Sequence, residues 1–253
     1  MAFILKQLNA LESTNSHLLD MFAAGEVAGN IAVSADYQSG GKGLGTNRWY
    51  SDHGLNLLFS FGWCPLDFHP SKQFLVTQAA TLAILDSLKE LYPKIKPVIK
   101  WPNDIWVGNQ KLAGILVSNI IEGKKLTFSV IGIGVNVNQT IFPAELPNPV
   151  SLKSLLNMDL DRVYLLNSLL QHIDVGLMQI ENNSSTLERN EKYLKNLMLL
   201  NTWQPYVIHD TLTEACIRSV NEFGQLMLEH KTGEIIAYGL KEVKFVIAGN
   251  DFE

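Results

Sequence analysis

The sequence predicts an α+β fold: a mixed, mostly antiparallel sheet covered by helices, followed by a small β-barrel. Strand-like segments at 97–108, 111–123 and 125–139 are separated only by the short breaks "GNQ" and "EGKK", which are typical of antiparallel hairpins. Residues 71–93 instead repeat apolar side chains at three- and four-residue steps, which indicates a helix with one apolar face. After residue 201, short strands alternate with Gly and Asn turns, and no helical period remains.

The N-terminal elements follow from local signals. Ser13 or Thr14 can cap the N-terminus of a helix, because the side-chain oxygen can accept a hydrogen bond from a free amide of the first turn. Gly25 would end this helix, because glycine readily adopts the left-handed conformation found at helix C-termini. Apolar runs on either side of this helix are suited to buried strands. The predicted elements here are strands at 3–8, 30–38 and 54–63 and a helix at 15–25.

Two longer helical segments complete the larger domain. Ser71 can cap the helix at 71–93, and Pro93 follows its end. Residues 161–200 are again amphipathic. We therefore expect a domain of residues 1–200 and a β-rich domain of residues 201–253. In the first, we expect helices on one face of the sheet and none of the βαβ crossovers that a Rossmann unit requires.

Composition excludes several classes of protein. The chain has 253 residues and a net charge of −5, which argues against a general nucleic-acid binder with a basic face. Its two cysteines, Cys64 and Cys216, form no CxxC pair, so a disulfide framework or a zinc site is not expected. No basic n-region with a cleavage site and no run of 18 apolar residues is present. We expect a soluble, cytoplasmic protein with no membrane span.

The segment "YQSGGKGLGTNRWYS" at 37–51 has the composition of an anion-binding loop. It fails the Walker pattern, because Gly43 follows Lys42 where Ser or Thr is needed. It also fails the dinucleotide fingerprint, because Thr46 replaces the last glycine and the segment leads into a strand rather than a helix. Its glycines can still turn backbone amides toward an anion, and Lys42 adds a positive charge there. A solvated surface hairpin is the alternative.

Two further clusters, at residues 100–119 and 132–138, favour a ligand site. In "KWPND", Lys100 and Asp104 lie four residues apart, so in one strand both would point to the same face. In "KLAGIL", Gly114 stands where a side chain would project, which often marks the close approach of a ligand. In "GIGVNVN", alternate glycines expose backbone, and Asn136 offers the donors and acceptors that suit a purine edge. A surface ion pair and a twisted strand explain the same residues without a ligand.

Taken together, these motifs resemble those of the biotin–protein ligases, also called biotin–[acetyl-CoA-carboxylase] ligases. The resemblance covers nearly the whole chain, and "KWPND" followed closely by "KLAGIL" is its specific part. It implies a class II synthetase-like catalytic domain and an SH3-like C-terminal domain. The matching pieces are "STN" at 13–15, "YQSGGKGLGTNRW" at 37–49, "KWPND" at 100–104, "KLAGIL" at 111–116 and "GIGVNVN" at 132–138.

The resemblance implies an activity and its partners. Members of the family join biotin to ATP, which gives biotinyl-5′-AMP and pyrophosphate, and then transfer the biotinyl group to one lysine of a carrier protein. The implied partners are biotin, ATP with Mg²⁺, and the biotin carboxyl carrier domain of a biotin-dependent carboxylase. No metal-ligating residues of the protein are predicted. Which carboxylase supplies the carrier does not follow from the sequence.

The resemblance also implies roles for individual residues. Ser13, Thr14, Asn15 and Gln38 would hydrogen-bond the biotin ring, and Lys111 would contact the biotin carboxylate and the α-phosphate. The predicted biotin and adenylate site is completed by Gly41, Lys42, Gly43, Leu44, Trp49, Gly114 and Asn136, with Asn136 facing the adenine.

Lys111, Lys42 and Asp104 are the predicted catalytic residues. Two anions must meet, and the two lysines would offset their repulsion and the charge that develops at the α-phosphate. Asp104 would position the acceptor amine or accept its proton. Leu44 stands where the family often has arginine, so we expect a less positive loop.

Alternatives remain. A lipoate–protein ligase would have a similar fold and also form an acyl-adenylate, and a non-catalytic biotin-binding protein would keep the pocket alone.

Only twelve residues precede Ser13, so we expect none of the DNA-binding domain that some members carry, and no DNA partner. Exposed sheet edges make a homodimer an open expectation.

Overall fold

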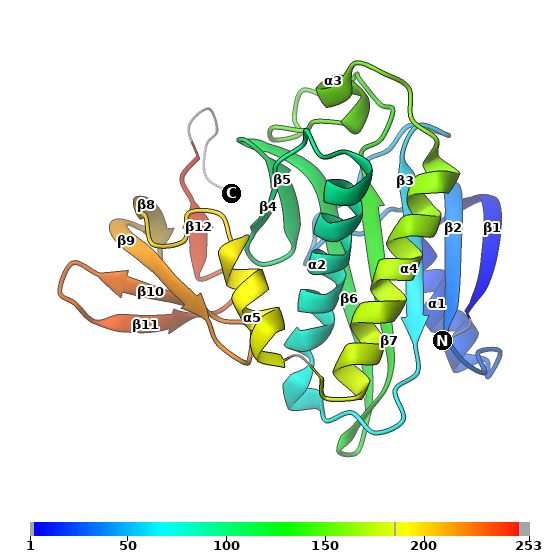
Figure 1. The fold of residues 1–253 in the computed structure, drawn as a ribbon, viewed down its shortest axis with the longest axis horizontal. Helices are drawn as coiled ribbons and strands as arrows, with labels where there is room; N and C mark the ends of the chain where they lie inside the picture. Colours follow the sequence, from blue (N-terminus) through cyan, green and yellow to red (C-terminus); the bar gives the residue numbers. More distant parts are fainter. Residues whose placement is uncertain (1–2, 185, 248–253) are drawn as a thin grey trace.

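The structure is a computed structural model, and it describes residues 3–184 and 186–247. A seven-stranded sheet forms the centre of the larger domain (Figure 1), in the order β1-β2-β3-β7-β6-β5-β4. β1 and β2 are parallel and the other neighbours antiparallel, which confirms the predicted mixed, mostly antiparallel sheet. The strands are β1 (Ile4–Leu11), β2 (Ile31–Gln38), β3 (Leu57–Trp63), β4 (Pro97–Lys100), β5 (Asp104–Val107), β6 (Gln110–Glu122) and β7 (Lys125–Val135).

The predicted absence of βαβ crossovers was wrong. The helix α1 (Thr14–Ala23) connects β1 to the parallel strand β2, which makes one βαβ unit. Ser13 caps α1 as predicted, because its side chain accepts from the Ser16 amide. This crossover is long enough to hold a helix, and parallel neighbours cannot be joined by a tight turn. The later segments have the pattern of antiparallel hairpins, which does not indicate that β1 and β2 are parallel.

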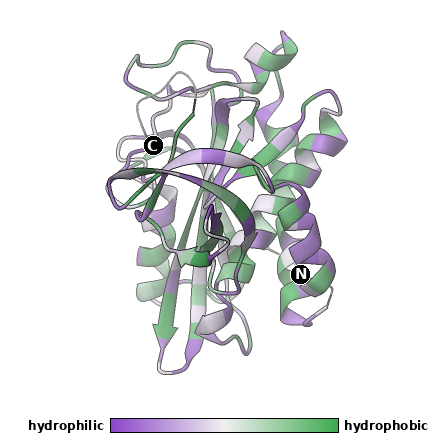
Figure 2. Cartoon of the chain, turned by 90° about the vertical axis from the view of Figure 1, so that its left-hand side faces the viewer, coloured by the Kyte–Doolittle hydropathy of each residue, from purple (hydrophilic) through white to green (hydrophobic). Residues whose placement is uncertain are grey.

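Helices cover both faces of the sheet, where one covered face was expected. Because side chains alternate along a strand, Ile31 and Val33 pack against α1 while Ala32 faces the opposite core. That second core lies under three helices (Figure 1), and strand residues and the inner sides of the helices are its main hydrophobic regions (Figure 2). The three helices are α2 (Phe74–Leu91), α4 (Arg162–Glu181) and α5 (Thr186–Lys195).

The start of α2 differs from the prediction. Ser71 does not cap it: residues Pro70–Lys72 form a separate 3₁₀ turn, and His69 accepts from the Ser71 amide at 3.2 Å. Gln73 is the N-cap residue of α2, and its side chain makes no capping hydrogen bond. The helix ends at Leu91, before Pro93, as expected. A short helix, α3 (Leu152–Leu156), was not predicted.

Residues 97–108 form two strands rather than one. The chain turns back at residues 101–103, where the Trp101–Pro102 peptide is cis. Lys100 and Asp104 are therefore directly opposite each other on β4 and β5. The expectation that they share one strand four residues apart was wrong, although the turn still places both beside the same cavity.

The C-terminal part is the predicted all-β unit. Its strands form an antiparallel sheet in the order β11-β10-β9-β8-β12. Its apolar residues, Tyr206 and Ile217 among them, join the core under α2, so the domain boundary near residue 201 stays a prediction. The predicted domain ends at 253, beyond the described residues. The strands are β8 (Trp203–Ile208), β9 (Thr211–Val220), β10 (Leu226–His230), β11 (Ile235–Tyr238) and β12 (Val243–Phe245).

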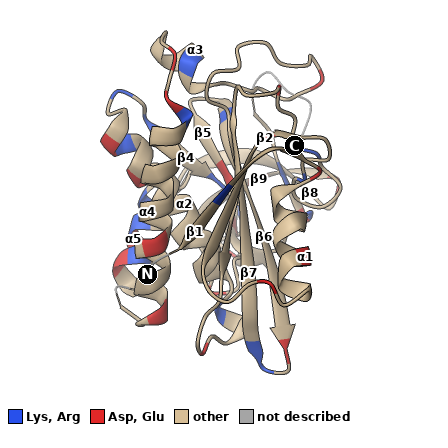
Figure 3. Ribbon diagram, turned by 90° about the vertical axis from the view of Figure 1, so that its right-hand side faces the viewer, with Lys and Arg blue, Asp and Glu red and all other residues tan. Residues whose placement is uncertain are grey.

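Charged residues lie mainly on helices and loops, while most strand residues of the large sheet are uncharged (Figure 3). None of the described helices is long and apolar enough to cross a membrane. Cys64 and Cys216 are free thiols, as expected.

We expect Leu85→Ala to lower the free energy of unfolding by about 2–5 kcal/mol, because Leu85 on α2 is fully buried and the change leaves a cavity. Urea denaturation followed by circular dichroism measures this. The control is Leu66→Ala, at a side chain that is 88% exposed, which should change the value by less than about 0.5 kcal/mol. Equal effects of the two changes would contradict the described core.

Candidate active site

A cavity of about 1100 Å³ opens on the α1 side of the sheet. The pattern along β7 explains its position. Phe128 and Val130 point to this side and pack beneath α1, and the next two residues of the same parity are Gly132 and Gly134. Where the bulky residues give way to glycine, the sheet has no side chains to fill the space, and both glycines line the cavity.

The cavity concentrates positive charge. Among the described residues that line it, six carry a positive charge and one carries a negative charge. The whole chain, in contrast, has a net charge of −5. A site of this kind focuses its potential on anionic ligands. The lining cations are Lys42, Arg48, Lys100, Lys111, Lys241 and Lys244, and the carboxylate is Asp104.

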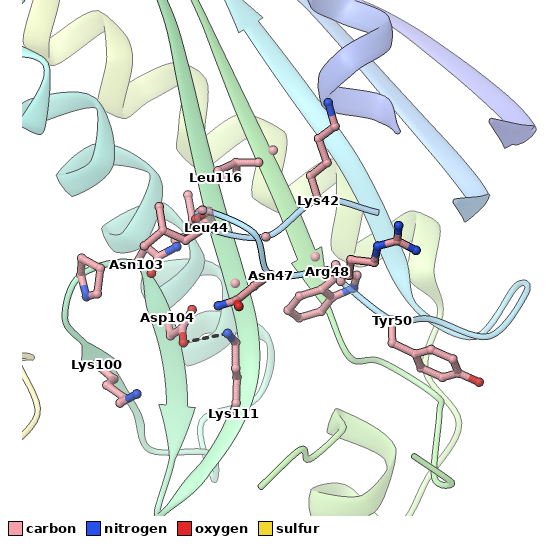
Figure 4. Close-up of a pocket in the computed structure, with 18 of the residues that line it drawn as sticks. Lys42, Leu44, Asn47, Arg48, Tyr50, Lys100, Asn103, Asp104, Lys111 and Leu116 are labelled. Carbon is pink, nitrogen blue, oxygen red and sulfur yellow. Dashed lines mark hydrogen bonds and ion pairs between the residues drawn. The ribbon is translucent and has the colours of Figure 1, made fainter. Parts of the chain in front are cut away.

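Lys111 and Asp104 form the central ion pair of the site (Figure 4). The Lys111 ammonium lies 2.8 Å from Asp104 Oδ2, and their side chains are 29% and 13% exposed. The two residues come from the neighbouring strands β6 and β5. The backbone of Lys111 is also fixed, since its amide donates to Asn148 and its carbonyl accepts from Val150. The ammonium is therefore held at one place in the cavity.

Lys100 is held differently. Its ammonium lies 4.7 Å from the centre of the Trp106 ring and 5.3 Å from that of Phe245. The residue is only 6% exposed. Aromatic faces attract a cation electrostatically, more strongly where water is excluded. Because Phe245 belongs to β12, this contact joins the large sheet to the C-terminal five-stranded sheet.

The glycine-rich loop connects β2 to β3 and forms a narrow hairpin. Gly43 N donates to Asn47 O at 2.8 Å, and Trp49 N donates to Gly41 O at 3.0 Å. A Cβ at Gly41 would lie 2.5 Å from Trp49 O, so glycine is needed there for the close backbone approach. Gly41 thus shapes the loop without lining the cavity, whereas Gly43 and Leu44 line it as predicted. The Lys42 side chain points toward α1, away from Asp104 (Figure 4).

Trp49 occupies the space above the sheet glycines. A Cβ at Gly134 would lie 2.3 Å from Trp49 Cε2, and one at Gly114 would lie 2.9 Å from Trp49 Cζ3. Gly114 was expected to mark the approach of a ligand, and in this structure the group that approaches is the indole ring. The Lys111 ammonium lies 5.8 Å from the same ring.

A polar cluster closes the opposite end of the cavity. Gln38 Oε1 accepts from the Thr14 amide at 2.6 Å and from Thr14 Oγ1 at 2.9 Å. Thr14 Oγ1 also lies 2.8 Å from Ser60 Oγ, a partner that the sequence did not reveal. Asn15 accepts from Ser118 Oγ at 3.1 Å. Because β1 and β2 are parallel, the end of β2 lies beside the end of β1, where α1 begins, and this brings the groups together.

The Asn136 side chain holds the backbone near Lys111 in place. Its side-chain amide donates to Val150 O at 3.1 Å and to Lys111 O at 3.4 Å, so it secures the strand that carries the central lysine. No described residue donates a hydrogen bond to its side-chain oxygen, which leaves this atom for a ligand. Tyr50, at the rim, donates to Asp52, and this hydrogen bond raises the pKa of the Tyr50 hydroxyl.

The structure brings together all predicted site residues except Gly41 in one cavity. It adds cationic residues that were not predicted: Arg48 from the loop, and Lys241 and Lys244 from the second domain. The segment "GLKEVKF" contains both of these lysines, but no spacing links it to the other motifs. Only the fold shows that it faces the same space.

We expect Gly134→Ala to displace the loop, because the new methyl group would overlap the Trp49 ring. Limited digestion with chymotrypsin, which cleaves after aromatic residues, should then cut several-fold faster at Trp49 or Tyr50. The control is Gly29→Ala, where nothing lies within 4 Å of the added Cβ and the rate should not change. Unchanged cleavage of Gly134→Ala would show that Trp49 does not rest on this glycine.

Comparison with known proteins identifies the family of this chain. Residues 8–136 match the family described as "Biotin/lipoate A/B protein ligase family". "Bifunctional ligase/repressor BirA" of Escherichia coli is 30% identical over 88% of this chain and 68% of its own length. "Biotin--[acetyl-CoA-carboxylase] ligase" of Mycobacterium tuberculosis is 31% identical over 69% of this chain and 64% of its own.

A solved structure shares the fold. It is a biotin protein ligase from Aquifex aeolicus in complex with biotin and ATP, with a TM-score of 0.78 and 25% identity. The match covers 95% of this chain and 97% of the other. Because residues 8–136, about half of the chain, match the family, the chain belongs to the biotin/lipoate A/B protein ligase family.

Proposed function

We propose that this protein is a biotin–protein ligase that forms biotinyl-5′-AMP from biotin and ATP and transfers the biotinyl group to a lysine of a biotin carboxyl carrier domain. The observation that carries the proposal is one cavity with a polar hydrogen-bonding end and a cationic floor. The names of the relatives and the biotin and ATP in the similar structure support it.

The two ends of the cavity suit the two ends of the adenylate. Ser13, Thr14, Asn15 and Gln38 offer donors and acceptors for the ureido ring of biotin. In the absence of a ligand, Thr14 and Gln38 satisfy each other, so biotin would exchange these bonds for its own. The adenine would lie at the other end, near Asn136.

The first step would need charge compensation more than a nucleophile from the protein. A carboxylate oxygen of biotin attacks the α-phosphorus, and pyrophosphate leaves. Lys111 lines the cavity, and its ammonium would face the carboxylate and the α-phosphate as they meet. Asp104 keeps its ammonium in place, and such preorganised charge stabilises a transition state without further rearrangement.

Mg²⁺ would enter with ATP as part of the substrate. Among the described residues, no group of three or more His, Cys, Asp and Glu side chains gathers in one place. Asp104, the carboxylate of the cavity, already pairs with Lys111. The donors that fit Mg²⁺ are therefore the phosphate oxygens and water, which it prefers in nucleotide sites. The ion would supply neutralisation of phosphate charge.

The second step would use Asp104 again. The acceptor lysine must be neutral to attack the mixed anhydride, and a carboxylate nearby can orient its amine or take a proton. Oδ2 of Asp104 pairs with Lys111, so Oδ1 is the atom we assign to the amine. The glycine loop would cover the adenylate and keep water from the anhydride.

Two other activities fit the site less well. The family description includes lipoate ligases, but the Mycobacterium tuberculosis relative is named a biotin ligase and the Aquifex aeolicus structure contains biotin. The polar cluster around Gln38 also suits a ureido ring. A non-catalytic biotin-binding protein would not need the ion pair that fixes Lys111. Incubation with biotin, ATP and a carrier domain, followed by mass spectrometry, separates the two cases, because a pure binder adds no biotinyl mass.

Three expectations stay predictions: a carboxylase carrier domain as the acceptor, the cytoplasmic location and the homodimer. The edge strands of the large sheet are β1 and β4, and Ile99 of β4 already bonds to residues 196 and 198, so β1 is the edge where two copies could pair.

ATP–pyrophosphate exchange should depend on biotin and not on lipoate. Biotin fills the polar end with matching hydrogen bonds, whereas the dithiolane of lipoate leaves buried polar groups there unpaired, which is costly. The measurement is incorporation of labelled pyrophosphate into ATP with each acid in turn. Exchange supported by lipoate alone would replace the proposed substrate.

Lys111→Ala should slow formation of the adenylate by about 10²–10³-fold, the usual effect of losing one preorganised charge. Lys42→Ala should cost much less, because its side chain lies on a loop and points toward α1. Single-turnover assays with biotin in excess over enzyme measure both rates. Equal losses would refute this order, and circular dichroism confirms that each variant is folded.

A further inference from the structure

A buried hydroxyl next to the polar end of the cavity takes no part in the proposed chemistry. Ser60 lies on β3, is fully buried and does not line the cavity. Its neighbours across the sheet are Val33 of β2 and Gly132 of β7, and neither offers a polar side chain. A hydroxyl buried in apolar surroundings is costly unless it forms a hydrogen bond. Among the described residues, the hydrogen-bond partner of this side chain is Thr14 Oγ1, at 2.8 Å.

The direction of the hydrogen bond between Ser60 and Thr14 follows from the other bonds of Thr14. The Thr14 backbone amide can only donate, and it lies 2.6 Å from Gln38, so the Gln38 atom on this side must be the carbonyl oxygen. An amide oxygen only accepts, so the Thr14 hydroxyl also donates to it, at 2.9 Å. Because a hydroxyl has one proton, Ser60 must donate to Thr14 Oγ1. The chain of donors therefore runs from Ser60 through Thr14 to Gln38.

The backbone amide and the hydroxyl of Thr14 together form a site for one carbonyl oxygen. In the free protein, the side-chain oxygen of Gln38 accepts from both groups. Thr14 is the first residue of α1, and the first amides of a helix have no partner within the helix and attract electron-rich atoms. The oxygen of a ureido group is an acceptor of the same kind as the amide oxygen of Gln38. It fits the same two donors once the Gln38 side chain moves aside.

Ser60 determines whether the Thr14 hydroxyl offers the ligand a donor or an acceptor. A hydroxyl without fixed partners rotates and serves as either. While Ser60 donates to Thr14 Oγ1, the proton of Thr14 is directed to the position that the Gln38 oxygen occupies. Hydrogen bonds linked in a chain also polarise and strengthen one another. Removal of the Ser60 hydroxyl would leave Thr14 beside the ligand but would no longer fix its proton.

We propose that Ser60 is a positioning residue that sets the specificity of the polar end. Through Thr14, it selects an acid whose ring carries a carbonyl acceptor, as the ureido ring of biotin does, and it disfavours a ring that presents only donors there. This inference rests on the proposed function, because it takes biotin as the ligand of the polar end. Ser60 itself does not touch the ligand.

The test compares biotin with 2-iminobiotin, in which a guanidinium group replaces the ureido group at neutral pH, so that this end of the ring donates and does not accept. Isothermal titration calorimetry measures the dissociation constants of both acids for the full chain. Ser60→Ala should weaken the binding of biotin by about five- to tenfold, the usual effect of losing one hydrogen bond, and that of 2-iminobiotin by less than about twofold. The preference for biotin should therefore fall.

Ser129→Ala is the matched control. Ser129 is a fully buried serine on β7 that donates to Asn119 Oδ1 at 2.7 Å and does not line the cavity. Its replacement should leave the ratio of the two dissociation constants unchanged. Ser60→Cys, which fills a similar space with a much weaker donor, should shift the ratio in the same direction as Ser60→Ala. It tests the inference even if the alanine variant does not fold.

A double-mutant cycle tests whether Ser60 acts through Thr14. In a Thr14→Val background, Ser60→Ala should change the ratio by less than about twofold, because the hydroxyl that Ser60 orients is gone. An undiminished effect in that background would overturn the inference, and so would an equal loss of both acids in the single Ser60 variants. If the unaltered protein binds biotin but makes no biotinyl-5′-AMP from it and ATP, the proposed function fails, while the calorimetry still tests the role of Ser60.

Discussion

The concentration of positive charge in one cavity of an acidic protein is the constraint on which the site depends. Six cations and one carboxylate line a space of about 1100 Å³. Cations gathered so closely repel one another, and burial adds to the cost. The structure offsets this in three ways: Asp104 neutralises Lys111, aromatic rings enclose Lys100, and the remaining cations stay near solvent. An anionic ligand would reduce the repulsion that remains among these cations, so the charge of the cavity favours the binding of anions.

Much of the fold and site could be predicted because local patterns set them. The hairpins, the capped α1 and the β-rich C-terminal part follow from turn residues and periodicity. The parallel pairing of β1 with β2 could not, since it depends on which distant strands meet. The opposition of Lys100 and Asp104 was missed because a turn at residues 101–103 interrupts what looked like one strand. Lys241 and Lys244 could not be assigned, because their part in the cavity arises from domain packing.

The glycines of the large sheet show how a pattern can be right while its first explanation is wrong. Gly114 and Gly134 do mark a close approach, as their positions in strands indicate. The approaching group in this structure is Trp49, carried there by the glycine loop. A sequence reports that space is needed above a strand, but it does not say which atoms fill that space. The Lys111 ammonium lies 5.8 Å from the same indole ring.

The contact of Lys100 with Trp106 and Phe245 links the large sheet to the C-terminal sheet. The Lys100 ammonium lies 4.7 Å from the centre of the Trp106 ring and 5.3 Å from that of Phe245, and Phe245 belongs to β12. A change at Phe245 would therefore remove one of two aromatic faces beside a lysine that is only 6% exposed. Movement of the C-terminal sheet away from the large sheet would have the same effect, so the surroundings of this lysine depend on how the two sheets pack.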